Sequence, residues 1–224
     1  MSNQKTQVML VDDHAMMRHG ITLLVNKEPD MQVCAEAGDG GEALAQLKKN
    51  GRRVDIVLLD ITLKTIPGFE VIKGMHLLKP ALPVLFVSMH DEEVYAERAL
   101  QVGGRGYVSK QETGTVLLTA IREVLKGNIY LSKRMHAKLL RKISAGYSKP
   151  ELLISTLTVS EFEVLHLIGA GHSSQEIAKL LNRSVNTIET HRFNIRTKLN
   201  LKDGADLIRY ASQWNLAELR KAMS

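Results

Sequence analysis

The sequence predicts an α/β domain built on a five-stranded parallel sheet, followed by a smaller all-helical domain. Three observations indicate this. In residues 7–125, short apolar runs alternate with amphipathic stretches. From residue 156 onward the spacing of apolar residues is helical throughout. Between them, residues 146–150 read Gly-Tyr-Ser-Lys-Pro, which is typical of a flexible joint. Alternating strands and helices are typical of a parallel sheet with helices on both faces.

Five strand–helix units account for the first domain, which we place at residues 1–127. The apolar runs predict strands at 7–12, 31–36, 54–59, 83–88 and 105–108. The amphipathic stretches predict helices at 14–27, 40–50, 68–78, 92–102 and 112–126. Glycine and proline residues mark the turns between them. A region of this size and order fits a flavodoxin-like sheet.

Gly127-Asn128 is a helix C-cap signal, and apolar residues at helical spacing then predict a connector helix over about 132–144. We place this linker at 128–155 and the second domain at 156–224. Two capping boxes predict that helices begin near 159 and 174, and they end near 169 and 181. Ser184 can cap a third helix that reaches Leu199, and a fourth is expected near 204–213. Short helices with Gly171 in the turn between them suggest a helix-turn-helix unit.

The formal net charge of +6 is unevenly distributed. Residues 1–130 carry 15 basic and 16 acidic side chains, and residues 151–224 carry 9 and 8. The segment 131–150 holds six basic side chains and no acidic one. Such a segment attracts a polyanion such as DNA. The alternative is a solvated connector helix that is basic by chance.

Several function classes are disfavoured by composition. Cys34 is the single cysteine, which excludes an intramolecular disulfide, and we expect it to be a small buried side chain of the strand at 31–36. The first seven residues are polar and do not resemble a signal peptide. No apolar run approaches the roughly 18 residues that a membrane span needs. We therefore expect a soluble cytoplasmic protein without a membrane partner.

Four predicted strands end in residues that can carry chemistry: Asp12-Asp13, Asp60, Ser88 and Lys110. The carboxyl ends of parallel strands lie at one edge of a sheet, where open α/β folds place their sites. Three carboxylates there would repel one another without a cation, and an oxygen-rich site suits Mg²⁺, or Mn²⁺. An Asp can attack a phosphoryl group to give an aspartyl phosphate. Lys110 and the metal could neutralise the phosphoryl oxygens, and Ser88 could donate a hydrogen bond to one.

This set of residues resembles the receiver-domain signature of two-component response regulators. The resemblance implies that Asp60 is the phosphoacceptor and that a sensor histidine kinase donates the phosphoryl group. It implies that Mg²⁺ is held by Asp12, Asp13, Asp60 and the backbone carbonyl of Thr62. Ser88 would be the switch hydroxyl, and Tyr107 would be the switch aromatic that moves inward. Pro67-Gly68 is similar to the family's turn after the acceptor strand, whereas Gln111 stands where many receivers have proline after the lysine.

The stretches 157–165, 171–181 and 187–199 resemble a LuxR-type DNA-binding domain. With the receiver in front, the whole chain is similar to NarL/FixJ-class response regulators. The resemblance implies a helix-turn-helix at 174–193, with a recognition helix from Ser184 that enters the major groove. Glu189, Thr190 and Phe193 would meet base edges. We assign Arg192, Arg196 and Lys198 to phosphates, and Thr187 and His191 to phosphates or helix packing. Family members often carry lysine near Glu189 or Phe193, so its absence suggests weaker attraction or a different site sequence.

The predicted protein is a bacterial regulator of transcription and not an enzyme. Its expected partners are double-stranded promoter DNA, a sensor histidine kinase, RNA polymerase and, when phosphorylated, a second copy of itself. One alternative is a DNA-binding regulator that no longer uses phosphate. A second is a Mg²⁺-dependent phosphatase similar to the haloacid-dehalogenase class, which the adjacent Asp12-Asp13 and the absence of a cap domain disfavour. We expect His14 and His19 to face solvent or a groove, and Trp214 to pack against the fourth helix.

Overall fold

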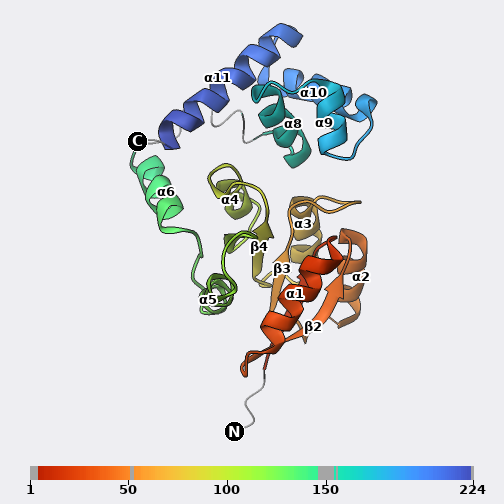
Figure 1. The fold of residues 1–224 in the computed structure, drawn as a ribbon, viewed down its shortest axis with the longest axis vertical. Helices are drawn as coiled ribbons and strands as arrows, with labels where there is room; N and C mark the ends of the chain where they lie inside the picture. The colour runs from red at the N-terminus through yellow and green to blue at the C-terminus, as the bar shows by residue number, and fades with distance from the viewer. Residues whose placement is uncertain (1–4, 51–52, 146–153, 155, 223–224) are drawn as a thin grey trace. The chain divides into compact units, whose positions relative to one another are not determined.

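The computed structural model describes residues 5–50, 53–145, 154 and 156–222 (Figure 1). The chain forms two compact units, Met1–Lys142 and Ile143–Ser224. Each unit has its own buried apolar side chains, and each is described separately below.

The first unit contains a five-stranded parallel sheet, as predicted (Figure 1). The strands are β1 (Thr6–Val11), β2 (Met31–Ala37), β3 (Ile56–Leu59), β4 (Val84–Ser88) and β5 (Gly106–Ser109). Their order in the sheet is β2-β1-β3-β4-β5, which is the flavodoxin-like order. The register pairs Leu10 of β1 with Leu58 of β3, and Leu59 of β3 with Phe86 of β4. The C-terminal ends of β1, β3, β4 and β5 therefore lie along one edge of the sheet.

Helices cover both faces of this sheet. They are α1 (Ala15–Asn26), α2 (Gly40–Asn50), α3 (Gly68–Leu78), α4 (Glu92–Gln101) and α5 (Gly114–Leu125). On one face, Leu10 and Leu58 pack with Ile21 of α1 and Ile121 of α5. On the other face the Phe86 ring lies 4.8 Å from the ring of Phe69 in α3. β3 and β4 are buried along their whole length, which is why their sequences are continuous apolar runs.

The strand β2 lies at the edge of the sheet, and its burial alternates along the sequence. Cys34 is exposed there, so the expectation that it is buried is wrong. Successive side chains of a strand point to opposite faces of the sheet, and Cys34 lies on the face of β2 where Gln32 and Glu36 are also exposed.

Packing of the first unit continues beyond α5. Tyr130 forms a bridge next to β5, with the Tyr107 N–H donating to the Tyr130 carbonyl at 2.9 Å. Leu131 and Met135 are both buried. Met135 lies on α6 (Lys133–Ala145), the connector helix that the sequence predicts. The first turn of the connector helix is therefore anchored to the first unit.

The second unit is helical, as predicted, with α8 (Val159–Gly169), α9 (Ser174–Leu180), α10 (Val185–Leu199) and α11 (Gly204–Ala222). Both predicted capping boxes are present, one at Thr158 and Glu161 and one at Ser173 and Glu176. Ser184 caps α10 by accepting a hydrogen bond from the Thr187 N–H at 3.1 Å. Helix α9 ends at Leu180 and α10 begins at Val185, so a short turn joins them in a helix-turn-helix arrangement.

The fourth helix is longer than predicted, because it continues to Ala222 and not to 213. Leu207 and Ala211 are buried, and Trp214 continues the same face one turn later. The Trp214 ring packs edge-on against Phe162 of α8, with ring centroids 5.3 Å apart. Trp214 thus lies on α11, the fourth helix of this unit, and packs against α8, the first. Our expectation that Trp214 packs against the fourth helix is wrong. An apolar stripe at this spacing extends a helix through tertiary packing. In the part of the chain that the structure describes, we find no helix long and apolar enough to cross a membrane.

Candidate functional site

Three of the predicted site residues meet at the C-terminal edge of the sheet. The Lys110 Nζ lies 2.6 Å from Oδ2 of Asp60 and 2.7 Å from Oδ2 of Asp12. All three side chains are at most 4% exposed. One ammonium thus bridges two buried carboxylates that come from different strand ends, at distances typical of charge-assisted hydrogen bonds.

Backbone contacts fix the positions of these side chains. The Asp60 N–H donates to the Val11 carbonyl at 2.9 Å, and the Lys110 N–H donates to the Ser88 carbonyl at 2.8 Å. The turn after Asp60 needs a glycine, because a Cβ on Gly68 would lie 2.0 Å from the Asp60 carbonyl oxygen. The Gly68 N–H also donates to the Ile61 carbonyl at 2.8 Å. The Pro67-Gly68 turn therefore lets α3 begin in direct contact with the acceptor strand.

Burial and charge oppose each other at this cluster. Burial raises the pKa of Asp60 above its ordinary value, and the neighbouring Lys110 only partly offsets this. Burial acts to lower the pKa of Lys110, but Asp60 and Asp12 outweigh it and raise that pKa. Lys110 is therefore held in its charged form, and the carboxylates still carry more charge than one lysine neutralises.

The acidic residues form a group that could hold a cation. Asp12, Asp13, His14 and Asp60 each place one potential ligand atom within 4.8 Å of the others. Buried carboxylate oxygens in excess over cations favour a hard divalent ion. We expected His14 to face solvent. Its side chain is 67% exposed, but its Nδ1 lies 2.8 Å from Oδ1 of Asp13, so it also borders this group.

The predicted switch residues lie around His90, a residue that sequence reasoning missed. The Thr62 hydroxyl and His90 Nε2 are 2.7 Å apart, and the Thr62 N–H donates to Oδ1 of Asp60 at 3.2 Å. Ser88 is fully buried, and its hydroxyl accepts a hydrogen bond from the His90 N–H at 3.3 Å. The Tyr107 hydroxyl donates to the His90 carbonyl at 2.8 Å. The available signal was position, since His90 follows the end of β4 by two residues.

Tyr107 already occupies an inward position in this structure, with 1% of its surface exposed. Burial raises the pKa of its hydroxyl, which therefore stays protonated and able to donate. At the departure from the receiver pattern, the Glu112 N–H donates to the Ser109 carbonyl at 3.0 Å, and the Gln111 N–H donates to the Ser109 hydroxyl at 3.2 Å. The described residues contain no cis peptide bond, so Gln111 takes part in a turn built on trans bonds.

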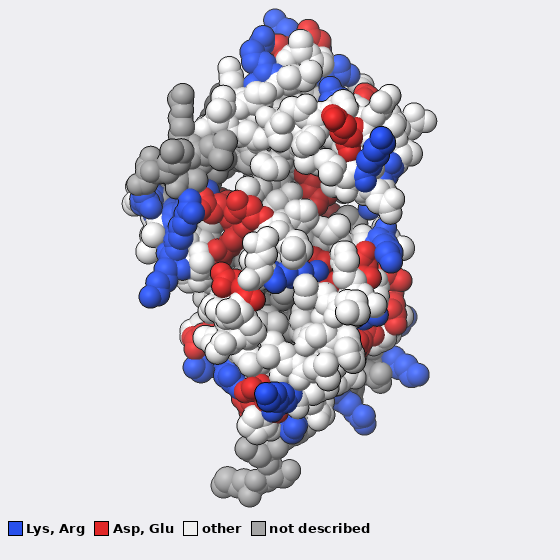
Figure 2. Space-filling view, viewed as in Figure 1, with Lys and Arg blue, Asp and Glu red and all other residues white. Residues whose placement is uncertain are grey.

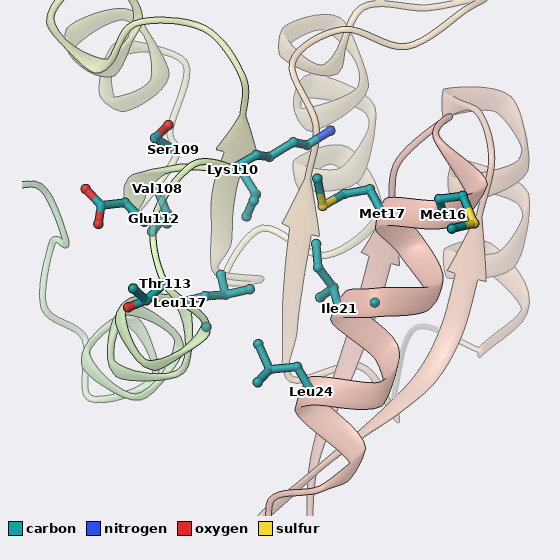
Figure 3. A pocket seen from close by; sticks show the side chains of 13 residues that line it. Met16, Met17, Ile21, Leu24, Val108, Ser109, Lys110, Glu112, Thr113 and Leu117 are labelled. Carbon is teal, nitrogen blue, oxygen red and sulfur yellow. The ribbon is translucent and has the colours of Figure 1, made fainter.

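A cavity of about 320 Å³ lies beside the cluster, between α1 and the turn from β5 to α5. Figure 3 shows Met17, Ile21 and Leu24 of α1 on one side and Leu117 on the other. Lys110 lines its upper end (Figure 3). The cavity is therefore mainly apolar and lies next to the lysine that bridges Asp12 and Asp60.

On α10, the three residues predicted to meet base edges share an exposed face. Glu189 and Thr190 are exposed, and Phe193 has 59% of its surface exposed. The Ser174 hydroxyl of α9 donates to Oε1 of Glu189 at 2.5 Å, which holds the carboxylate in one orientation. The Arg196 guanidinium carbon lies 5.8 Å from the centre of the Phe193 ring. This face combines an acid, a hydroxyl and an aromatic ring, with one cation over the ring.

Most of the other residues predicted to contact DNA have neighbours within the helical domain. The sequence predicts a phosphate contact for Lys198, whereas the structure pairs its Nζ with Oε2 of the buried Glu161 at 2.6 Å. His191 is half-buried, and burial lowers the pKa of its ring, which favours the neutral form. Arg192 is mostly buried along α10 and lies 3.8 Å from Glu189. The capping residues Ser184 and Thr187 have their hydroxyls 2.8 Å apart at the start of the helix.

Comparison with known proteins identifies both units. Residues 8–122 match the family of response regulator receiver domains, and residues 155–211 match the bacterial regulatory proteins of the luxR family. The chain belongs to the LuxR-family response regulators. The oxygen regulatory protein NreC of Staphylococcus epidermidis is 31% identical to this response regulator over 220 residues, which cover 95% of this chain and 99% of NreC.

Solved structures agree with this assignment. RcsB from Salmonella enterica serovar Typhimurium, bound to the promoter rprA in the presence of the phosphomimetic BeF₃⁻, is 27% identical with a TM-score of 0.59. The match covers 93% of this response regulator and 99% of RcsB. A LuxR-family response regulator from Aurantimonas sp. SI85-9A1 is 30% identical with a TM-score of 0.58, and covers 63% of this chain and 99% of its own. The acidic edge therefore belongs to a receiver domain, and α9 and α10 belong to a DNA-binding domain.

Proposed function

We propose that Asp60 accepts a phosphoryl group from a sensor histidine kinase and that this modification controls DNA binding by α10. The observation that carries the proposal is the bridge that Lys110 makes between Asp60 and Asp12, at 2.6 and 2.7 Å. A lysine held charged beside a carboxylate nucleophile is suited to neutralise a phosphoryl oxygen as it arrives.

In this proposal a carboxylate oxygen of Asp60 forms a new bond to phosphorus while the bond from phosphorus to the donor breaks. The leaving group takes the electron pair of that bond. Lys110 then shifts its hydrogen bond from Asp60 to a phosphoryl oxygen, and Ser88 donates its hydroxyl proton in a hydrogen bond to another. The His90 N–H, which donates to Ser88 at 3.3 Å, is the neighbour that must adjust. His90 also contacts Thr62 and Tyr107, so the β4–α4 loop would respond to the modification.

The residues present fit a divalent metal. Asp12, Asp13, Asp60 and the backbone carbonyl of Thr62 would hold it, and Mg²⁺ or Mn²⁺ suits this set of oxygens. When bound, such an ion supplies positive charge to the phosphoryl oxygens. Because these carboxylates are buried and in excess over Lys110, we expect the ion to stabilise the fold as well.

For the second domain we propose that α10 lies in the major groove of promoter DNA, with Glu189, Thr190 and Phe193 toward the bases. A carboxylate can accept a hydrogen bond from cytosine N4, and an aromatic ring can contact a thymine methyl. We further propose that Arg192 and Arg196 contact phosphates and that two copies bind as a dimer, because RcsB dimers on DNA have the same architecture. Half-sites about 34–36 Å apart would then be expected. We propose a cytoplasmic regulator, not an enzyme, that acts on RNA polymerase.

The experiment that tests the phosphoacceptor is intact mass spectrometry after incubation with Mg²⁺ and acetyl phosphate. The wild-type chain is expected to gain one phosphoryl group, and Asp60→Asn is expected to gain none. The same samples are then titrated with promoter fragments. DNA affinity that is unchanged by phosphorylation in the wild type would contradict control by Asp60 and support a regulator that does not use phosphate.

A further inference from the structure

The connector helix α6 carries the densest positive charge in the chain. Residues 131–150 contain six basic side chains and no acidic one, and the side chains of four of the six are described. Lys133, Arg134 and Arg141 are exposed, whereas the Lys138 side chain is 12% exposed. The first turn of α6 contains no acidic residue, although the N-terminus of a helix disfavours positive charge. Arg134 and Lys138 are also four residues apart, where like charges repel.

Two acidic residues at the start of α4 contact this helix. The Ser132 N–H donates to Oε1 of Glu92 at 2.8 Å, so Glu92 caps the start of α6 from outside. Glu93 forms an ion pair with Arg134, and its Oε2 lies 3.5 Å from the Lys138 Nζ. The Lys138 Nζ also donates to the Glu93 backbone carbonyl at 3.2 Å. In Figure 2, acidic side chains at the position of α4 adjoin basic side chains at the position of α6.

The segment 131–150 as a whole carries more positive charge than this one carboxylate supplies negative charge. The single carboxylate of Glu93 faces the cations of both Arg134 and Lys138. The Arg134 side chain is 63% exposed, and an ion pair with so exposed a member contributes little to stability. A partner that offers many negative charges could therefore replace Glu93 as the counterion. DNA is such a partner, since its phosphates repeat along the helix and release counterions when they are neutralised.

We propose that α6 is an accessory surface for DNA phosphates, and that Glu93 masks two of its cations, Arg134 and Lys138. The inference rests on the proposed DNA-binding function and adds a second, sequence-independent contact to it. Glu93 lies where a change at the phosphoacceptor site can move it. Glu93 lies three residues after His90, which contacts Thr62 and Tyr107. A rearrangement of the β4–α4 loop would therefore move the counterion of the connector.

The test is the salt dependence of DNA binding by the full chain. Fluorescence anisotropy with a labelled duplex of arbitrary sequence, at several salt concentrations, compares wild type with Glu93→Gln. Each phosphate that is neutralised adds about 0.9 to the slope of log affinity against log salt. Unmasking two cations is therefore expected to steepen that slope by up to about 1.8. The matched control is Glu112→Gln, which removes the same charge from an exposed side chain on the β5–α5 turn and is expected to leave the slope near that of wild type.

A second variant separates charge at α6 from a general effect. Adding Arg134→Gln and Lys138→Gln to the Glu93→Gln chain is expected to remove the steepening. The circular dichroism spectrum of each variant checks that the fold is intact, and Glu93→Ala takes the place of Glu93→Gln if the latter fails to fold. Equal slopes for Glu93→Gln and Glu112→Gln would overturn the inference while leaving DNA binding through α10 intact. A wild-type chain that binds no DNA at low salt would overturn the proposed function itself.

Discussion

At the acidic edge of the receiver domain, the side chains of Asp12, Asp60 and Lys110 are buried and in contact with one another. On α10, by contrast, Glu189, Thr190 and Phe193 are exposed. The receiver site is thus preassembled, with its charges removed from water before any ligand arrives. The DNA-binding face has polar and aromatic groups, and two of the cations near it, Arg192 and Lys198, lie beside glutamates of the same domain.

This difference shows where charge acts in each domain. In the receiver, low exposure strengthens every electrostatic interaction, so the same residues can stabilise the fold and bind a phosphoryl group. In the helical domain, Lys198 of α10 and the buried Glu161 of α8 form an ion pair that links the two helices. In the proposed complex, affinity for DNA comes from dimerisation, from Arg192 and Arg196, and from positive charge elsewhere, of which the connector helix is the densest source.

The largest effect is expected from Gly68→Ala, which tests whether the receiver site depends on tight packing around Asp60. A Cβ at this position would lie 2.0 Å from the Asp60 carbonyl oxygen, so backbone must move. We expect a loss of about 3 kcal/mol or more in the free energy of unfolding. Chemical denaturation followed by circular dichroism measures it, and mass spectrometry with acetyl phosphate measures the accompanying loss of phosphorylation. Wild-type stability together with normal phosphorylation would show that the site tolerates displacement of this strand end.

The next effect is expected from Glu161→Gln, which tests whether Lys198 is structural. Burial acts to raise the pKa of Glu161, but Lys198 and Thr158 outweigh it, so the pKa lies below its ordinary value. The carboxylate then stabilises the helical domain above the unfolded pKa of about 4.3, and this contribution disappears as the pH falls through the folded pKa. We expect a loss of about 2 kcal/mol at neutral pH that shrinks under acidic conditions.

Trp214 provides the measurement for this variant. It is the single tryptophan of the chain and packs on Phe162, the residue after Glu161. Urea denaturation followed by tryptophan fluorescence at two pH values therefore reports the helical domain alone. If the Glu161→Gln chain is as stable as wild type at neutral pH, the ion pair is not structural, and Lys198 is a candidate for a DNA phosphate contact, as the sequence predicts.

A smaller effect is expected from Ser174→Ala, which tests whether Ser174 of α9 orients Glu189, the α10 side chain proposed to contact a base. Without the 2.5 Å hydrogen bond from Ser174, the Glu189 carboxylate can adopt several orientations. Discrimination at the base that Glu189 contacts is then expected to fall by about 1 kcal/mol, or roughly fivefold. Affinities for a selected duplex and for the same duplex changed at one base pair measure this. The salt slope serves as the internal control, because Ser174 is not proposed to contact phosphate.

The smallest effect is expected from Gly20→Ala, which is the counterpart of Gly68→Ala. Gly20 lies in the middle of α1, beside the apolar cavity, and an added Cβ would meet nothing within 4 Å. Alanine is the better helix former, so the free energy of unfolding should rise by about 0.5–1 kcal/mol. Denaturation under the conditions used for Gly68→Ala checks it. Destabilisation instead would indicate that the cavity closes around Gly20 in solution.

The sequence by itself determined the order of strands and helices, the two capping boxes and the set of residues at the strand ends. The alternation of apolar runs with amphipathic stretches is a local property of the sequence. The grouping of strand ends at one edge follows from the topology of a parallel sheet, so neither prediction needs coordinates. The family resemblance, carried by Asp12, Asp60 and Lys110, followed from the same positions. Helix ends and burial were less reliable, as the extension of α11 past 213 and the exposure of Cys34 demonstrate.

Only the tertiary structure decided which charged groups are paired with one another. The partners of Lys198 and Lys138 are Glu161, 37 residues away, and Glu93, 45 residues away. The same holds for His90, whose contacts with Thr62 and Tyr107 join two loops and strand β5 at the sheet edge. A sequence specifies which side chains carry charge. Whether that charge binds DNA, holds a helix or bridges two carboxylates depends on distances between residues that are remote along the chain, and those distances are set by the packing of the whole fold.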